Sequence, residues 1–317
     1  MKALVTGVAG QDGTLLSREL LNKGWNVFGT RLPSETIGAA HPLAMGDVQE
    51  LDVTQPLAVE KLISDVKPDV VFHLAGITSV GFSFKEPELT MSVNLGGTQN
   101  LINAIHNSSP QTHLIHAAST EIFDANSGVI SESNSLNPIS PYAESKAAAY
   151  QLCVTARSEG LFVTNAVLAN HESPLRPTDF VTGKIANAVA RISLGLDQAL
   201  TLGNTDIQKD WSSASDIVDG LIQIAEQKYV GDVILASGVS THLQEIIAEA
   251  FAYVGISNWQ DYVKSDATLI RAGESKSIKI DSTKALAVLG WKAKTPMPQW
   301  VGEMVQHHLD ELARKNF

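Results

Sequence analysis

The sequence predicts an α/β protein in which helices cover both faces of a doubly wound parallel sheet, followed by a smaller C-terminal lobe. Short apolar runs alternate with stretches of helical periodicity in the first half, and the chain becomes polar and proline-punctuated after about residue 166. Apolar strands joined by helical crossovers are typical of a parallel sheet buried on both faces. A chain of 317 residues, 44% of them hydrophobic, is long enough to bury such a core.

The first part of the chain, residues 1–166, contains the expected sheet and its covering helices. The strands are short apolar runs, and the helices repeat apolar residues every three or four positions. The expected strands are Ala3–Thr6, Trp25–Thr30, Asp69–Ala75, His113–Ala118 and Leu161–Leu168. The expected helices are Leu15–Asn22, Leu57–Val66, Leu89–His106 and Tyr142–Ser158. His113 and His116 alternate along one strand, which favours a structural role for both.

Residues 167–317 are expected to form mainly a substrate-binding lobe, with parts near 206–240 returning to the first domain. The polar stretch 170–177 is interpreted as a substrate loop. Helices are predicted near Val181–Ser193 and Asp216–Glu226, and a strand is predicted near Val233–Ala236. Ser282 is a plausible N-cap for a later helix that ends at Gly290.

Composition narrows the class of protein. The net charge of −11 disfavours nucleic acid or an anionic membrane as a partner, and it means that an anionic substrate needs a locally basic pocket. No run of eighteen apolar residues is present, and Met1-Lys2-Ala3 enters the first strand directly, which argues against a signal peptide. The single cysteine, Cys153, excludes an internal disulfide and fits a helix core in a reducing cytoplasm. No spacing of ligand-type residues suggests a metal.

A glycine-rich turn follows the first apolar run. Gly7, Gly10 and Gly13 frame Gln11 and Asp12, and a helix is expected to start near Asp12. A tight strand-to-helix turn without side chains lets the backbone approach a pyrophosphate, and the helix N-terminus supplies N–H donors. The pattern therefore favours a dinucleotide-binding Rossmann domain. The alternative is a plain turn that binds nothing.

The end of the second strand bears on which dinucleotide is bound. An acidic residue there would hold the ribose of NAD, but the chain has Arg31 and, shortly after, Ser34. Arginine and serine suit a 2′-phosphate, so NADP is favoured over NAD, unless Arg31 is an ordinary surface residue. Asp52 is placed to contact the adenine or, alternatively, to cap a helix.

Tyr142 and Lys146 are candidates for acid–base chemistry beside a nicotinamide. They are four residues apart on a predicted helix and so lie on one face. Tyrosine titrates near pH 10, and a lysine ammonium and an oxidised nicotinamide would favour its phenolate. Ser119, at a strand end, would hydrogen-bond the reacting hydroxyl. A tyrosine–lysine pair also occurs by chance, but less often after a serine at a strand end.

Glu121 is the residue that would change the reaction. A simple alcohol dehydrogenase needs no carboxylate two residues after Ser119. A carboxylate there can remove a proton next to a newly formed ketone and pass it to a leaving hydroxyl, which is a dehydration. Alternatively, Glu121 only holds the local turn or a substrate hydroxyl.

These motifs resemble the extended short-chain dehydrogenase/reductases and, within them, the GDP-mannose 4,6-dehydratase family. The similarity covers most of the chain. Its most specific segments are residues 6–13, 170–174, 180–192, 202–204 and 209–211. The resemblance implies an NADP enzyme that acts on GDP-mannose or a related nucleotide sugar, and a homodimer formed by the helices beginning near Leu89 and Tyr142. It leaves tetramer formation open.

The resemblance also implies roles for individual residues. Ser119, Glu121, Tyr142 and Lys146 align with the catalytic group. Tyr142 would take the proton of the sugar 4-hydroxyl, and Glu121 would take the C5 proton and assist loss of the C6 hydroxyl. The implied cofactor set adds Val53, Leu74, Ala75 and His171 to the residues named above. The implied substrate set is Asn170, Val181, Lys184, Arg191, Gly203, Asn204, Lys209, Arg271 and Glu274.

Alternatives remain for several of these residues. Lys184 and Arg191 can instead form a solvated helix face, and Val181 can be ordinary core. The family's arginine at position 209 is a lysine here, and Arg31 stands alone where the family has a pair. The leading hypothesis is a GDP-mannose 4,6-dehydratase. The others are a nucleotide-sugar 4-reductase or epimerase, and a catalytically silent NADP sensor, which would need none of Ser119, Tyr142 and Lys146.

Overall fold

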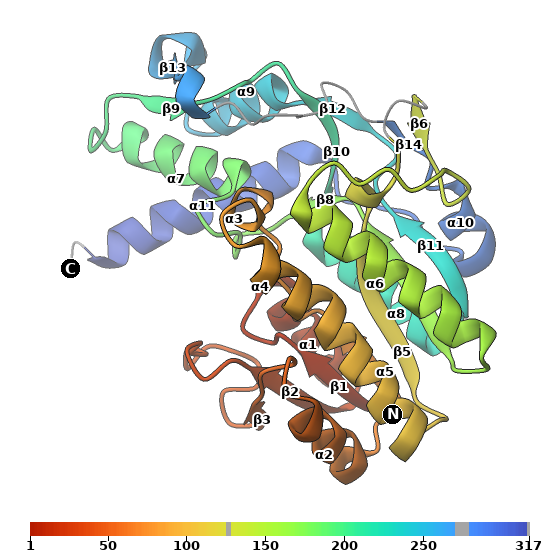
Figure 1. Cartoon of the computed structure of the whole chain (residues 1–317). Coiled ribbons are helices and arrows are strands. Elements are labelled where there is room, and N and C mark those ends of the chain that lie inside the picture. Colours follow the sequence, from red (N-terminus) through yellow and green to blue (C-terminus); the bar gives the residue numbers. More distant parts are fainter. Residues whose placement is uncertain (125–127, 270–278, 316–317) are drawn as a thin grey trace.

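A seven-stranded parallel sheet forms the centre of the molecule. The computed structural model describes residues 1–124, 128–269 and 279–315 (Figure 1). The strand order is β11-β7-β5-β4-β1-β2-β3, and every neighbouring pair is parallel. The strands are β1 Lys2–Thr6, β2 Asn26–Arg31, β3 Asp47–Glu50, β4 Val70–His73, β5 His113–Ser119, β7 Val163–Leu168 and β11 Gly231–Leu235.

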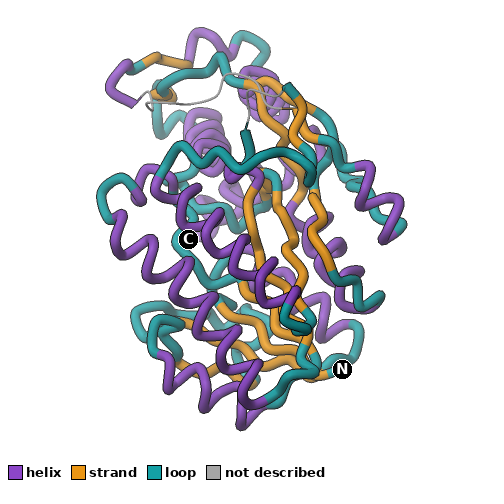
Figure 2. The backbone as a smooth tube through the Cα atoms, turned by 45° about the vertical axis from the view of Figure 1, so that its right-hand side comes forward, coloured by secondary structure: helices purple, strands orange, loops and turns teal. Residues whose placement is uncertain are grey.

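Helices cover both faces of this sheet, as Figure 2 shows from the side. On β1, Ala3 and Val5 pack toward one set of helices, and Leu4 packs toward the other. The first set is α1 Gln11–Asn22 and α8 Ala214–Glu226. The second set is α2 Pro56–Val66, α5 Gly97–Ser108 and α6 Pro141–Ser158, and buried Cys153 lies in this core. Because successive strand residues point to opposite faces, apolar strands bury both, which confirms the predicted α/β class.

The chain reverses its direction of strand addition between β1 and β4. From β1 it proceeds to β2 and β3, whereas β4, β5, β7 and β11 extend the sheet the other way. Ligands of open α/β sheets bind at such a switch point, outside the carboxyl ends of the strands. The glycine turn and the end of β4 meet at this point.

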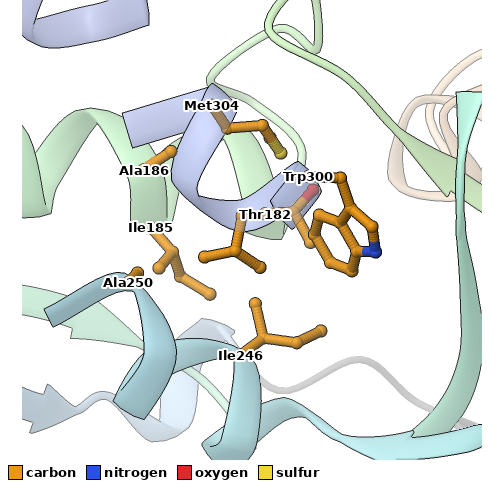
Figure 3. A pocket seen from close by; sticks show the side chains of 8 residues that line it. Thr182, Ile185, Ala186, Ile246, Ala250, Trp300 and Met304 are labelled. Atoms are coloured by element: carbon orange, nitrogen blue, oxygen red, sulfur yellow. The ribbon is translucent and has the colours of Figure 1, made fainter. Parts of the chain in front are cut away.

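The second lobe is built from three helices and small sheets. The helices are α7 Val181–Ser193, α9 Leu243–Tyr253 and α11 Met297–Lys315. Figure 3 shows that Ile185, Ile246, Trp300 and Met304 face one another between them, and these buried side chains form the lobe's core. One sheet contains β8 Asn170–Glu172, β10 Gln208–Ser213 and β12 Ser240–His242, and another pairs β9 Leu200–Leu202 with β13 Val263–Ser265.

Several details differ from the sequence-based expectation. The edge strand β3 was not predicted, and the stretch 170–177, interpreted as a loop, begins with the strand β8, which pairs with β10. The expected helix Leu89–His106 is a continuous helical segment of α4 Pro87–Met91, a π-helical turn η1 Ser92–Gly96, and α5. Ser282 does precede α10 Thr283–Leu289, which ends at Gly290, but its side chain makes no cap. Asp281 takes that role, since its Oδ1 accepts from the backbone nitrogen of Thr283 at 2.9 Å and from its hydroxyl at 2.6 Å.

Short elements complete the fold. They are α3 Val80–Ser83, the 3-10 turns η2 Thr120–Ile122, η4 Trp259–Tyr262 and η5 Ala267–Leu269, and the paired strands β6 Val129–Ile130 and β14 Lys279–Ile280. Across the described ranges, no helix has both the length and the apolar character needed to cross a membrane.

Candidate active site

The glycine turn is packed so closely that two of its glycines admit no side chain. A Cβ on Gly7, which has a φ of +75°, would lie 2.9 Å from the backbone nitrogen of Ala75. A Cβ on Gly13 would lie 2.3 Å from the carbonyl oxygen of Gly7. Gly10 differs, because it is exposed and its Cβ would meet Gly7 only at 3.5 Å. The packing of the fold therefore requires glycine at positions 7 and 13. At Gly10 the packing does not require glycine, and the backbone there is exposed without a side chain.

Gly10 is also the N-cap of α1, and no side chain caps this helix end. The first N–H groups of a helix have no partner within it, and they attract anions. A bare glycine at an uncapped helix start at the switch point fits the pyrophosphate of a dinucleotide. The residues predicted for that role are thus placed together.

Leu74 and Ala75 lie against this turn. Their backbone nitrogens donate to the Thr6 hydroxyl, at 3.2 and 3.1 Å. This hydroxyl also bonds Nδ1 of His73 at 2.9 Å. The carboxyl ends of β1 and β4 are therefore fastened together, and Leu74 and Ala75 border the predicted cofactor site.

Two sequence segments that are far apart meet directly at the start of α1. The amide of Gln11 donates to the carbonyl of His171 at 3.2 Å and accepts from the Ser173 hydroxyl at 2.8 Å. Asp12 Oδ2 and His171 Nε2 are 2.9 Å apart. The glycine turn is therefore bound to the segment 170–174, where the chain enters the second lobe.

The Asp12–His171 contact is an ion pair. His171 Nδ1 lies 2.7 Å from the carbonyl oxygen of Ala169, so both ring nitrogens face acceptors, an arrangement that favours the protonated, charged ring. Burial alone would lower the pKa of His171, but the charge and hydrogen bond of Asp12 raise it above its ordinary value. Burial would raise the pKa of Asp12, but His171, with smaller contributions from Arg176 and Gln11, lowers that pKa to about 2.

The candidate catalytic side chains lie together beyond the end of β5. Ser119 ends that strand, and its hydroxyl accepts from the backbone nitrogen of Glu121 at 3.2 Å. Tyr142, in the first turn of α6, is buried, and Ser119 lies close enough for its hydroxyl to lower the pKa of the phenol. Burial is the largest influence on the tyrosine, and together with the charge of Glu121 it raises the pKa of Tyr142 to about 12.

Lys146 lies one turn further along α6. Its Nζ donates to the carbonyl oxygen of Ala117 at 2.8 Å, and burial lowers its pKa to about 8. In the protein alone, burial outweighs the influences that lower the pKa of Tyr142. The share expected from the charge of an oxidised nicotinamide stays a prediction.

Lys209, which was expected to bind the diphosphate, forms an ion pair within the protein. It reaches across from β10, and its Nζ lies 3.0 Å from Oε1 of Glu121. The two side chains retain only 17% and 24% of their exposure. The residue expected to bind the nucleotide is thus an ion-pair partner of the candidate base.

The residues expected around the adenosine have local partners. Arg31, at the end of β2, donates to the carbonyls of Leu32 and Glu35, and one of its nitrogens lies 3.0 Å from Oε1 of Glu50. Ser34 is exposed beside it. Asp52 accepts from the backbone nitrogen and hydroxyl of Thr54, a local turn before α2. The capping alternative is wrong, because the N-cap of α2 is Gln55 and no side chain caps that helix. Val53 is buried, and its carbonyl accepts from Asn100.

The remaining substrate candidates are spread over the second lobe. Arg191 is paired with Asp197 at 2.6 Å, near the end of α7, so its guanidinium is already engaged. Lys184 lies near Asp266, and it lowers the pKa of that carboxyl less than the hydrogen bonds of Thr268 do. The others are Asn170 on β8, half-buried Val181 at the start of α7, and Gly203 and Asn204 after β9. Arg271 and Glu274 lie outside the described residues.

Comparison with known proteins assigns the family. A model described as GDP-mannose 4,6 dehydratase matches residues 4–304. GDP-mannose 4,6 dehydratase 2 of Arabidopsis thaliana is 35% identical over 329 aligned residues, which cover 99% of this chain and 88% of that relative. The chain belongs to the GDP-mannose 4,6-dehydratase family. The resemblance stated from the motifs is thereby confirmed, and dehydratases of this kind are hydro-lyases.

Solved structures agree on the fold. RMD from Pseudomonas aeruginosa, complexed with NADPH, has a TM-score of 0.83 at 23% identity and covers 98% of this chain and 99% of its own. UDP-glucose 4-epimerase from Thermus thermophilus, complexed with NAD, has a TM-score of 0.83 at 23% identity, with 97% and 99% covered. The first structure holds NADPH and the second holds NAD. Both similarities confirm the Rossmann fold.

Sequence reasoning missed two residues of this family member's site. Arg176 was read only as part of a loop, yet it bonds Glu172 at 2.8 Å and the carbonyl of His171, and it influences the pKa of both Tyr142 and Asp12. An arginine beside the specific segment 170–174 was the available signal. Asn94 was also missed.

Asn94 lies in the π-helical turn and fixes the wall of the site beside Lys146. It bonds the backbone nitrogen and carbonyl of Ile77 and donates to the hydroxyl of Ser145 at 2.9 Å. A Cβ on Gly76 would meet Asn94 Oδ1 at 2.9 Å and Lys146 Nζ at 3.6 Å. A π turn inside a longer helix often marks a functional site, and here it aims this amide inward.

Proposed function

We propose that this protein is a GDP-mannose 4,6-dehydratase that uses NADP. The observation that carries the proposal is Glu121, whose backbone nitrogen bonds Ser119 and whose charge, like the Ser119 hydroxyl, acts on the pKa of Tyr142. An alcohol dehydrogenase or an epimerase needs the serine, tyrosine and lysine but no carboxylate in this position. A dehydratase needs it, because a proton must leave C5 of the sugar and reach the departing C6 oxygen.

The chain's own groups balance the reaction. Tyr142 accepts the proton of the 4-hydroxyl, and Glu121 accepts the proton of C5. The bond from C6 to its hydroxyl breaks, and Glu121 delivers its proton to the leaving oxygen, which departs as water. Tyr142 returns its proton to C5. A bound nicotinamide supplies the remaining chemistry, because it takes hydride from C4 and gives it back to C6.

The cofactor would be held by the glycine turn. The uncapped start of α1 at Gly10 suits the pyrophosphate, and Leu74 and Ala75 border the ring side. Lys146 supports the ribose and the phenol of Tyr142 by analogy with the family. These assignments rest on placement at the switch point of the sheet.

Arg31 supports the choice of NADP over NAD. It is a cation at the end of β2 with exposed Ser34 nearby, where a 2′-phosphate would lie. The variant Arg31→Ala is expected to weaken NADP binding about 10- to 100-fold, because a charge-assisted hydrogen bond is lost, and to leave NAD binding nearly unchanged. Calorimetric titration with each dinucleotide measures this, and Arg18→Ala on the exposed face of α1 is the control. Equal losses for both dinucleotides would contradict the assignment.

The activity is tested with purified protein, GDP-mannose and less than one equivalent of NADP. Mass spectrometry is expected to show a sugar nucleotide lighter by one water, formed over many turnovers. The variant Glu121→Gln is expected to lose about 100-fold or more in rate while it still binds NADP. An isomer of unchanged mass would instead identify an epimerase. Reduction of a 4-keto sugar with one NADPH consumed per product would identify a reductase.

The proposal includes a homodimer formed by the adjoining α4–α5 and α6 segments, with a tetramer as a further assembly. Light scattering after size-exclusion chromatography tests it. The proposal also includes a cytoplasmic location, which fits the lone, buried Cys153.

A further inference from the structure

The ion pair of Glu121 and Lys209 joins two distant parts of the chain inside the site. The residues are 88 positions apart, and their bond is 3.0 Å long. Both side chains are largely shielded from water, at 24% and 17% exposure. Shielded pairs are screened little by salt, so this contact acts on the carboxylate more strongly than a surface pair would.

Lys209 projects from a rigid strand. β10 pairs with β12 on one side, where Lys209 is opposite Thr241, and with β8 on the other. The next residue, buried Asp210, accepts from the backbone nitrogens of Ser237 and Gly238 at 3.0 and 2.7 Å. A side chain anchored in this way can fix the position of its partner.

Glu121 needs such an anchor. It lies in the short turn η2, and its backbone nitrogen bonds Ser119. With Lys209 bonded to Oε1, the carboxylate has a defined orientation, and its other oxygen, Oε2, is the one to exchange a proton.

We propose that Lys209 is a positioning residue for Glu121 and acts in the water-loss step, rather than as a ligand of the nucleotide diphosphate. This inference rests on the proposed dehydratase function. The sugar carries its diphosphate on C1, whereas C4 and the C6 hydroxyl lie across the ring. Lys209 bonds the carboxylate of Glu121, which is proposed to act at C5 and C6 of the sugar. It therefore lies at the reacting end of the sugar and not at the diphosphate end.

The test compares Lys209→Met and Lys209→Arg with the parent protein. Lys23→Met is the matched control, since it removes another 3.0 Å ion pair between two elements, far from the catalytic group. The protein loaded with NADP is mixed rapidly with GDP-mannose, and the near-ultraviolet absorbance of reduced nicotinamide is followed alongside product release. Binding of GDP alone is measured by calorimetry.

For Lys209→Met we expect kcat to fall about 10- to 100-fold, with reduced nicotinamide building up because oxidation at C4 outruns water loss. GDP binding and KM are expected to stay within about twofold of the parent values. Lys209→Arg is expected to keep most of the rate, because a guanidinium also bonds a carboxylate. Adding Lys209→Met to Glu121→Gln is expected to cost little more, since both act in one step.

Weakened GDP binding with unchanged kcat would overturn the inference and make Lys209 a diphosphate ligand. Additive losses in the double variant would overturn it as well. If Lys209→Met does not fold, by circular dichroism, Lys209→Gln is measured in its place. A parent protein that forms no dehydrated product instead refutes the proposed function, so the two failures are distinguishable.

Discussion

At the scale of single residues, the Asp12–His171 pair makes stability depend on pH. The pKa of His171 is raised in the folded protein, so its contribution is complete below its ordinary value of 6.5 and is lost as pH rises through the raised value. The pKa of Asp12 is lowered to about 2, so its contribution is complete above 3.8 and is lost as pH falls toward 2. The Asp12–His171 pair therefore stabilises the folded protein most between about pH 3.8 and pH 6.5.

The variant His171→Gln measures this effect. We expect it to lower the free energy of unfolding by about 2 kcal/mol at mildly acidic pH, as for other charged hydrogen bonds, and by less at alkaline pH. Urea unfolding at several pH values gives the difference. His106→Gln on α5 controls for the loss of a histidine as such. A difference that grows toward alkaline pH would contradict the ion pair.

At the scale of elements, the turn between β1 and α1 separates a folding requirement from a binding requirement. A Cβ at Gly13 collides with the Gly7 carbonyl at 2.3 Å, whereas one at Gly10 fits at 3.5 Å. We expect Gly13→Ala to destabilise the fold by about 1–3 kcal/mol, as overpacking does. Gly10→Ala should leave the melting temperature unchanged but weaken NADP binding about tenfold or more, since the pyrophosphate would meet a methyl group. Thermal melts and calorimetric titrations with NADP on both variants measure these effects. Normal NADP binding by Gly10→Ala would contradict the proposal that the pyrophosphate binds at Gly10.

Most elements were predictable because their apolar side chains form visible runs. β3 was not, since Asp47 and Glu50 are exposed and only Val48 between them packs against the core. The π turn at Asn94 was equally invisible, because it changes hydrogen bonding without changing composition. Local spacing did indicate that Tyr142 and Lys146 share one helix, and both are buried on α6. The partner of Lys209 was not predictable, because an ion pair over 88 residues has no local signature.

At the scale of the whole molecule, the sheet depends on residues late in the chain. β11 pairs along the length of β7, and fully buried Ile217, Val218 and Leu221 of α8 cover one sheet face. We therefore expect a fragment of residues 1–166 to aggregate or to lack fixed tertiary structure, since it exposes a strand edge and an apolar face. Near-ultraviolet circular dichroism and sedimentation of the fragment, beside the full chain, test this. A soluble monomer that unfolds cooperatively would contradict it.

The contact of Gln11 with His171 and Ser173 has a thermodynamic consequence. Gln11 lies in the turn proposed to hold the cofactor's phosphates, and His171 and Ser173 lie in the segment proposed to open the sugar site, so the two proposed sites share hydrogen bonds. A ligand that shifts this junction from one side would also shift the binding surface on the other side. By reciprocity, nucleotide sugar and dinucleotide would then change each other's dissociation constants by one common factor. Such coupling would link retention of the dinucleotide to the presence of the sugar, which suits an enzyme that restores its cofactor in every cycle.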